Sequence, residues 1–456
     1  MSIQGEVTHL TRSWPEYRTI WRWHFYAGLI AIPFILWLAT TGAIYLFRPQ
    51  IEAWLDRGYD HLDITGPRAS AEAQVSAALQ AVPGSNLHFY QLPTTSQSAV
   101  QIIVGRGTAE YRVYVHPQTT RVMQIVNEAS RPMTVIFHLH GELLIGDRGS
   151  MIVELAASWA IVMVATGIFL WWPRGVKGLG GVLFPRLRQG QRIFWRDLHA
   201  VTGIWVSGLA LFLLLTGLPW ASNWGKYLAE IRSLTRTSGN PDWTSGSLAE
   251  AAVRLSRNPT GGQRVPHHGN NIGSTVPLYA GIDTIIAAVT PLHLAWPVLV
   301  APPMVPGGLW IAKSDAQNRT LRTSLQLDST GAMVRREDFS QQQWIDRWVE
   351  TGVAAHEGQL FGFLNQLLGL FTAICLVVLG LSALVLWWRR RPSKVLGAPA
   401  CQVPKRRLAY SFMLVLLLFC IYLPLLGASI LTVRVVELFV LRRIPATRKW
   451  LGLASA

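Results

Sequence analysis

Two stretches of nineteen residues decide the fold: HFYAGLIAIPFILWLATTG at 24–42 and HAVTGIWVSGLALFLLLTG at 199–217. Each begins with a histidine, has a glycine four residues later, and ends on a Thr-Gly step seventeen and eighteen residues after the histidine. No charged residue interrupts either stretch. A histidine at a membrane segment is costly unless it has a partner. His24 and His199, the first pair, are therefore candidate functional residues on a duplicated helix.

A second matched pair of histidines follows the same logic. His140 and His356 each lie thirty-two residues before the second Trp of a Trp-Trp step, at 171–172 and at 387–388, and each step runs into basic sequence. A lone histidine beside a membrane is more often a polar cap than a ligand, and Trp-Trp steps are typical of the aromatic belt at a membrane surface. Four histidines in duplicated register favour ligation of a group held between helices.

The composition predicts an α-helical integral membrane protein. Half of the residues are hydrophobic and 14% are charged. An uncharged apolar stretch of roughly 18 residues or more predicts a membrane-spanning helix. Five stretches qualify, and we expect two duplicated pairs of spanning helices with one helix added at the end: 25–47, 138–172 (apolar from Leu155, after an interfacial segment), 198–225, 356–388 and 408–433.

The distribution of charge predicts the topology. Much of the net charge of +16 lies in two short loops, 173–197 with six basic residues and one acidic, and 389–407 with seven basic residues and no acidic. Short basic loops mark the cytoplasmic side, so we expect residues 1–24 in the cytoplasm and the long stretches 48–137 and 226–355 outside. The excess charge then reflects topology and attraction to anionic lipid rather than a nucleic-acid surface.

The C-terminal tail, 434–456, departs from this pattern. Five crossings leave the tail outside, yet it carries five basic residues. Pro424 and Gly427 interrupt the last apolar stretch, which therefore has two interpretations. We expect a single crossing, and the alternative is a hairpin of two half-helices that returns the tail to the cytoplasm.

Both long stretches predict small exterior α+β modules. In the first, an amphipathic helix over 69–82 opens at Ser70, and strands are expected at 86–92, 99–104, 110–115 and 121–126. In the second, helices are expected near 247–256 and 280–290, and strands at 297–301, 308–313 and 321–327. The unit of spanning helix, exterior module and spanning helix thus occurs twice, and repeats of this kind place sites at the interface between them.

The chemistry of the four histidines indicates haem. The chain has three cysteines and no Cys-x-x-Cys-His, which excludes covalent c-type haem and an Fe–S cluster, and it has no glycine-rich nucleotide motif. The first pair is expected at the cytoplasmic ends of its helices and the second at the exterior ends. A b-type haem needs no cysteine and accepts two axial histidines, so two haems would give electrons a path across the membrane. Arg22 and Arg196 flank the first pair and would suit haem propionates.

One of the four ligands has a competitor. His138 and His140 both lie in a Phe-His-Leu-His step. His140 is preferred and His138 is the alternative, because His140 aligns with His356 when the Trp-Trp steps are superimposed. Glycines along the first pair of helices would let a flat macrocycle or another helix approach closely: Gly28, Gly42, Gly203 and Gly217.

Taken together, these motifs resemble the PepSY-associated transmembrane proteins, also called iron-regulated membrane proteins. The resemblance rests on the His24 stretch with Gly28 and Thr41-Gly42, on His-Gly-Glu-Leu-Leu-Ile-Gly-Asp-Arg-Gly from His140, Trp171-Trp172-Pro173-Arg174, Asp197-Leu198-His199, His-Glu-Gly-Gln-Leu-Phe-Gly from His356 and Leu386-Trp387-Trp388-Arg389. Residues 69–126 are similar to a PepSY module, and the resemblance covers nearly the whole chain.

The resemblance implies a function. Members of the family include ferric-siderophore reductases of the bacterial inner membrane with two b-type haems. It therefore implies two haem b, with the four histidines as axial ligands, periplasmic PepSY-like modules, and a ferric siderophore or other Fe(III) chelate as substrate. Because the chain has no flavin domain, the electron donor is expected to be quinol or a cytoplasmic reductase.

Three other functions stay open from the sequence. Duplicated halves with intramembrane polar residues also occur in transporters. A membrane-anchored binding or regulatory module would use the exterior domains and would not need the four histidines. A Cu or Zn site could use His138, His140, His267 and His268, but it would not explain the first pair.

Overall fold

The computed structural model describes residues 17–173, 178–234, 277–399, 414 and 417–451. The expected helix near 247–256, His267, His268 and the start of the expected fifth span lie outside the described residues. The chain divides into a helical unit and a sheet unit. The helical unit comprises Met1–Thr40, Ser150–Lys226 and Phe371–Ala456, and the sheet unit comprises Thr41–Gly149 and Tyr227–Leu370.

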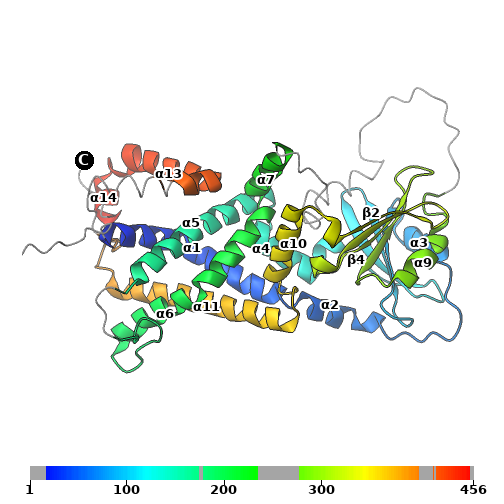
Figure 1. Ribbon diagram of the computed structural model, residues 1–456, viewed down its shortest axis with the longest axis horizontal. Coiled ribbons are helices and arrows are strands. Elements are labelled where there is room, and N and C mark those ends of the chain that lie inside the picture. The colour runs from blue at the N-terminus through cyan, green and yellow to red at the C-terminus, as the bar shows by residue number, and fades with distance from the viewer. Residues whose placement is uncertain (1–16, 174–177, 235–276, 400–413, 415–416, 452–456) are drawn as a thin grey trace, which may run out of the picture. The chain divides into compact units, whose positions relative to one another are not determined.

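Five helices of the described chain are long and apolar enough to cross a membrane (Figure 1). They are Tyr17–Tyr45 (α1), Asp147–Trp171 (α5), Gln191–Trp220 (α6, Gln191–Gly217, with the 3-10 turn Leu218–Trp220), Phe363–Arg390 (α11) and Pro424–Leu441 (α13, Pro424–Val436, with the π turn Glu437–Leu441). A helix satisfies its own backbone hydrogen bonds, as the lipid interior requires. The expectation of a multi-pass membrane protein is confirmed.

The fifth span differs from the expected 408–433. Residues 417–422 are helical, Leu423 leaves the helical region with ψ 80°, and α13 begins at Pro424. Trp224 Nε1, just beyond the end of α6, donates to Tyr422 O at 3.0 Å. At the other end of the unit, the Tyr26 hydroxyl of α1 donates to Leu451 O of α14 (Pro445–Leu451) at 2.9 Å. The chain after the break therefore returns to the end where α1 begins (Figure 1), and this favours the hairpin over the single crossing that we expected.

One antiparallel sheet of eight strands forms the sheet unit, in the order β4-β3-β2-β1-β5-β6-β7-β8. The strands are Asn86–Gln91 (β1), Val100–Arg106 (β2), Ala109–Val115 (β3), Val122–Asn127 (β4), Val298–Ala301 (β5), Trp310–Ser314 (β6), Thr323–Leu327 (β7) and Met333–Asp338 (β8). The two expected modules thus join into one sheet. The seam is short: β1 pairs with β5 through Tyr90 opposite Val300 and Gln91 opposite Leu299.

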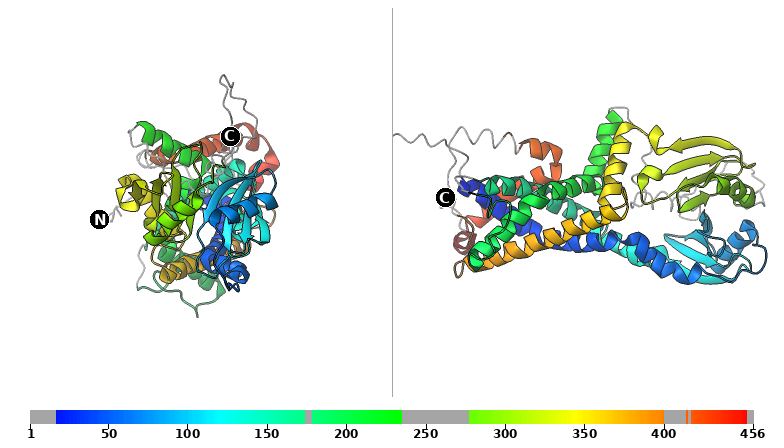
Figure 2. Two further views of the ribbon diagram at one scale, coloured as in Figure 1. Left: turned by 90° about the vertical axis from the view of Figure 1, so that its right-hand side faces the viewer. Right: turned by 60° about the horizontal axis from the view of Figure 1, so that its bottom comes forward.

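Two helices, α3 (Ala71–Ala81) and α9 (Ile282–Val289), pack on one face of this sheet (Figures 1 and 2). The core between them contains fully buried residues from both halves, among them Val75, Ile102 and Ile285. The Ser70 side chain caps α3 as expected, and the Asp283 carboxylate also accepts from the Ala71 amide at 2.6 Å. A residue of the second half therefore caps a helix of the first.

In each half, the last strand leads through a 3-10 turn into a short helix that carries a histidine of the second pair. β4 continues through Glu128–Ser130 into α4 (Pro132–Glu142), and β8 continues through Phe339–Gln341 into α10 (Trp344–His356). The remaining short elements are α2 (Arg48–Asp56), α7 (Ser222–Leu234) and the 3-10 turns Arg57–Tyr59, Thr290–Leu292 and Arg319–Leu321.

Candidate functional site

The first pair of histidines meets inside the helical unit. His24 on α1 and His199 on α6 have their ring centroids 6.4 Å apart, with an angle of 74° between the ring planes. The two rings therefore lie edge to face, at a centroid separation close to what two imidazoles on one shared metal atom need.

Each ring of the first pair is held at Nδ1 by the next candidate span in the chain. His24 Nδ1 lies 3.0 Å from Met163 O and 3.2 Å from Thr166 Oγ1 on α5. His199 Nδ1 lies 3.3 Å from Leu379 O and 3.2 Å from Ser382 Oγ on α11. A carbonyl oxygen only accepts, so Nδ1 carries the proton in both rings and Nε2 keeps its lone pair for a ligand.

The supports of the two rings occupy matching positions. Met163 and Leu379 each lie nine residues before the second Trp of a Trp-Trp step, and Thr166 and Ser382 each lie six residues before it. The duplicated register seen in the sequence thus extends to the hydrogen-bond partners of the histidines.

The second pair meets in the sheet unit with nearly the same geometry. His140 on α4 and His356 at the end of α10 have ring centroids 6.5 Å apart and an interplanar angle of 82°. Both residues lie on short helices that precede the candidate spans α5 and α11, in keeping with the interfacial segment that the sequence predicts before the second span.

His140, and not His138, faces His356. The Thr41 hydroxyl lies 2.9 Å from His140 Nδ1, and a Cβ on Gly42 would lie 3.2 Å from His140 Cε1. His138 Nδ1 instead lies 2.9 Å from the Glu142 carboxylate on its own helix. The Thr-Gly step of the opening motif therefore supports the ring of His140. Thr41 forms a hydrogen bond with that ring, and Gly42, which has no Cβ, leaves room for it.

The turn after His356 is fixed by side-chain amides. Asn365 Nδ2 donates to Ala355 O at 2.9 Å, and the Leu360 amide donates to Asn365 Oδ1 at 3.1 Å. Gln366 Nε2 donates to Leu46 O at 3.0 Å. These bonds tie the end of α10 to the first turns of α11 and to the end of α1.

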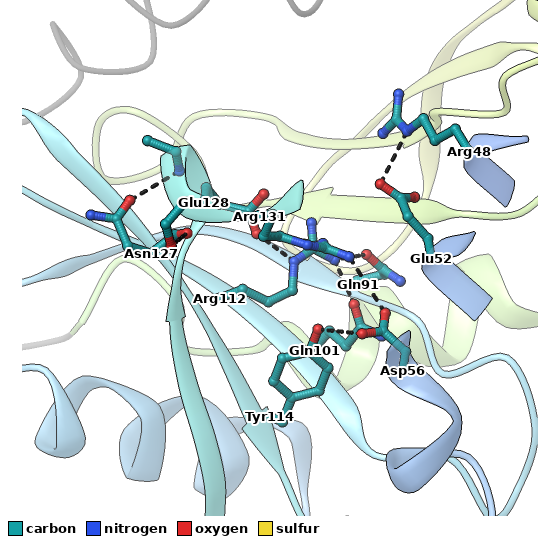
Figure 3. Close-up of polar contacts among 12 residues, drawn as sticks. Arg48, Glu52, Asp56, Gln91, Gln101, Arg112, Tyr114, Asn127, Glu128 and Arg131 are labelled. Carbon is teal, nitrogen blue, oxygen red and sulfur yellow. Dashed lines mark hydrogen bonds and ion pairs between the residues drawn. The ribbon is translucent and has the colours of Figure 1, made fainter. Parts of the chain in front are cut away.

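A largely buried charged network connects the sheet to the helix of His140 (Figure 3). Arg131, directly before α4, lies 3.5 Å from Asp56 Oδ2 of α2 and 3.7 Å from Glu128 Oε1. Arg112 of β3 also donates to Glu128, and to Gln91 Oε1 at the seam at 3.0 Å. Burial alone would raise the pKa of Glu128, but Arg112 and Arg131 outweigh it and hold that pKa below its ordinary value. The network holds α2 and α4 in fixed positions relative to the sheet.

The family described as the PepSY-associated TM region matches residues 21–390, a range that includes all four histidines and the whole sheet. The chain belongs to the PepSY-associated transmembrane family. No curated protein matches it. Residues 391–456, which contain α13 and α14, lie beyond the region that the family matches.

Both histidine pairs of this PepSY-associated chain fit a group that takes two axial imidazoles. Two nitrogens about 2 Å from a shared metal, with the radius of each ring added, put the ring centroids roughly 6 Å apart. The observed separations are 6.4 and 6.5 Å. Over the part of the chain that the structure describes, no group of three or more His, Cys, Asp or Glu could hold a metal ion. Each pair therefore offers a shared metal two imidazoles, without a third such protein ligand among the described residues.

The two arginines expected near the first pair each have protein partners. Arg22 donates to Pro399 O at 2.6 Å. Arg196 donates to the Asp197 carboxylate at 2.6 Å, and Arg186 donates to the same carboxylate at 2.7 Å. Two guanidinium groups on one carboxylate leave a positive charge in excess, which would suit an anionic group, and binding of propionates by Arg22 and Arg196 stays a prediction.

Three supporting residues escaped the sequence analysis. Thr166 and Ser382 hold the first pair, and a Cβ on Gly167 would lie 3.1 Å from His24 Cε1. Their equal offset from the Trp-Trp steps was a usable signal for Thr166 and Ser382. Gly28 and Gly203 do not make room for a ring in this way. A Cβ added at either position would meet its nearest atom at 3.8 or 3.6 Å, which is ordinary van der Waals contact.

Proposed function

We propose that the chain is a di-haem b reductase of the bacterial inner membrane that carries electrons to a periplasmic ferric chelate, such as a siderophore. The observation that carries the proposal is the two pairs of facing imidazoles, with ring centroids 6.4 and 6.5 Å apart, in which His24, His199 and His140 are held at Nδ1. A bound haem supplies a centre that accepts and gives up one electron at a time.

The chain's own residues perform the positioning. His24 and His199 would hold one haem through Nε2, the ring nitrogen left free by the contacts at Nδ1, and His140 and His356 would hold the other. Hydrogen bonds to the other ring nitrogen fix the tautomer and orientation of a metal-ligating histidine and raise its basicity. The carbonyls of Met163 and Leu379 perform this role in the first pair.

Electrons enter near the first pair from quinol or a cytoplasmic reductase and leave from the second pair. One electron reduces one Fe(III) of the chelate to Fe(II). The hard oxygen ligands of a siderophore hold Fe(II) less firmly, so reduction releases the iron for uptake. The short helices that carry the second pair continue from the sheet, and this continuity supports the sheet unit as the place where the chelate docks.

The test is a reduced-minus-oxidised visible spectrum of the purified full-length protein, with haem per chain measured by pyridine haemochromogen. Two b-type haems are expected for the wild type, and one for His199→Ala or His140→Ala. His138→Ala is the matched control for His140→Ala and should keep both haems. A protein made with ample haem that binds none would overturn the proposal.

Two other functions give different results in the same preparation. A transporter would take up solute in vesicles without haem absorbance, and a regulatory module would keep its activity in His199→Ala. Neither accounts for two facing histidine pairs with matching supports.

A further inference from the structure

The first two turns of helix α10, which carries His356, bury two acidic side chains and expose two indoles. Asp346 and Glu350 are 5% and 0% exposed, whereas Trp344 and Trp348 on the opposite face are 63% and 76% exposed. A surface helix normally turns its apolar stripe to the core and its charges to water. The outer face of α10 therefore suits a medium other than water.

A buried arginine of helix α7 holds α10 in place. Arg232 of α7 is 3% exposed, and its Nη1 and Nη2 donate to the Asp346 carboxylate at 2.5 and 2.9 Å. Its neighbour Ile231 is 40% exposed. A bidentate pair of guanidinium and carboxylate has strict geometry. The pair therefore fixes which faces of α7 and α10 point outward.

The first turns of α11 indicate which medium surrounds the exposed face of α10. Exposed apolar side chains begin directly after α10, at Phe361, Phe363 and Leu364. Because α11 is a candidate span, these side chains are expected to contact lipid. α10 lies crosswise to the first turns of α11 in Figures 1 and 2. A helix that lies crosswise at the end of a span lies along the membrane surface.

We propose that Trp344 and Trp348 insert into the headgroup region of the bilayer and hold the helix of His356 at the membrane surface. Tryptophan is enriched at this depth because one edge of the indole is polar and the rest is apolar. Arg347 is exposed beside the indoles and suits a lipid phosphate. Amphipathic helices with outward Trp and basic residues lie in this plane. The proposal involves no haem, so it stands or fails separately from the proposed function.

The experiment measures the depth of residue 348 in lipid. Trp348→Cys is made in the full-length chain with its three native cysteines changed to serine, and the thiol receives a fluorescent label. The protein is placed in phosphatidylcholine–phosphatidylglycerol vesicles with a nitroxide on some lipid headgroups. Leu364→Cys is the lipid-facing control, and Val334→Cys on β8, 57% exposed, is the control for an exposed sheet position.

The expected result is a loss of fluorescence at 348 comparable with that at 364 and larger than that at 334. Trp344→Cys gives an independent reading if Trp348→Cys does not fold. A loss at 348 no greater than at 334 would overturn the proposal. So would efficient disulfide cross-linking of two chains through residue 348, because a second copy would then cover the indoles.

Discussion

Gly42 is the position where the smallest change should disturb the second pair most. A Cβ added there would lie 3.2 Å from His140 Cε1 and 3.6 Å from Nδ1. Carbon atoms pack at about 3.5–4.0 Å, so in Gly42→Ala the ring must move by roughly 0.3–0.8 Å. The Thr41 hydroxyl lies 2.9 Å from Nδ1, and the ring cannot move away without lengthening that bond.

Disturbing such a support typically lowers metal affinity by about 10–100-fold. We therefore expect Gly42→Ala to keep the first-pair haem and to lose or shift the second. The assay is a redox titration followed by visible absorbance, together with haem content per chain. Both haems should be resolved in the wild type.

Gly28→Ala is the matched control. Gly28 lies on the same helix, and a Cβ there would meet its nearest atoms at 3.8 and 3.9 Å, which is ordinary contact. The gain in helix propensity, about 1 kcal/mol, is the same for both substitutions. If Gly42→Ala titrates like Gly28→Ala, with two haems of unchanged potential, the argument that Gly42 makes room for a ligand is wrong.

Three further predictions follow from the supports, the network and the tail. Thr166→Val and Ser382→Ala should keep both haems and change the potential of the first-pair haem alone in the same titration, because each removes a hydroxyl beside a ring nitrogen; a change in the other haem would contradict this. The lowered pKa of Glu128 means that its contribution to stability is present above its unfolded pKa of about 4.3 and is lost as pH falls through the lower folded value. Glu128→Gln should therefore destabilise the sheet unit by roughly 2 kcal/mol at pH 7 and by progressively less as pH falls below about 4.3, as measured by denaturant unfolding, and an effect that does not decrease toward low pH would exclude the ion pair with Arg112 as the cause. A fusion at the C-terminus should be fluorescent with green fluorescent protein and inactive with alkaline phosphatase, because the chain after Pro424 returns toward the end where α1 begins; an active phosphatase would restore the single crossing.

Features that leave a local or repeated pattern in the sequence could be predicted. These are the spanning helices, the strands and the pairing of the histidines. The first four spans follow from apolar length, and seven of the eight strands follow from patterning and turns. The assignment of histidines to pairs also followed from register, since His24 and His199 occur in one motif and His140 and His356 in another. The structure brings the members of each motif together.

Features that depend on distant partners were not predictable. The seam joins Gln91 to Leu299, and no local pattern marks either residue as an inner edge. β8 was missed because its residues are almost all exposed and show no apolar alternation. The carbonyls that hold the first pair belong to Met163 and Leu379, and a backbone oxygen leaves no trace in the residue type.

The seam between β1 and β5 also determines when the sheet can be completed during synthesis of the chain. Tyr90 pairs with Val300, which the ribosome adds 210 residues later, so at about 5–20 residues per second the partner arrives roughly 10–40 s after Tyr90. Over that interval the edge of β1 is open, and open edges pair with foreign strands. The Ala71 amide also lacks the cap that Asp283 later supplies. The nascent first half therefore has to be shielded from aggregation until the second half is made.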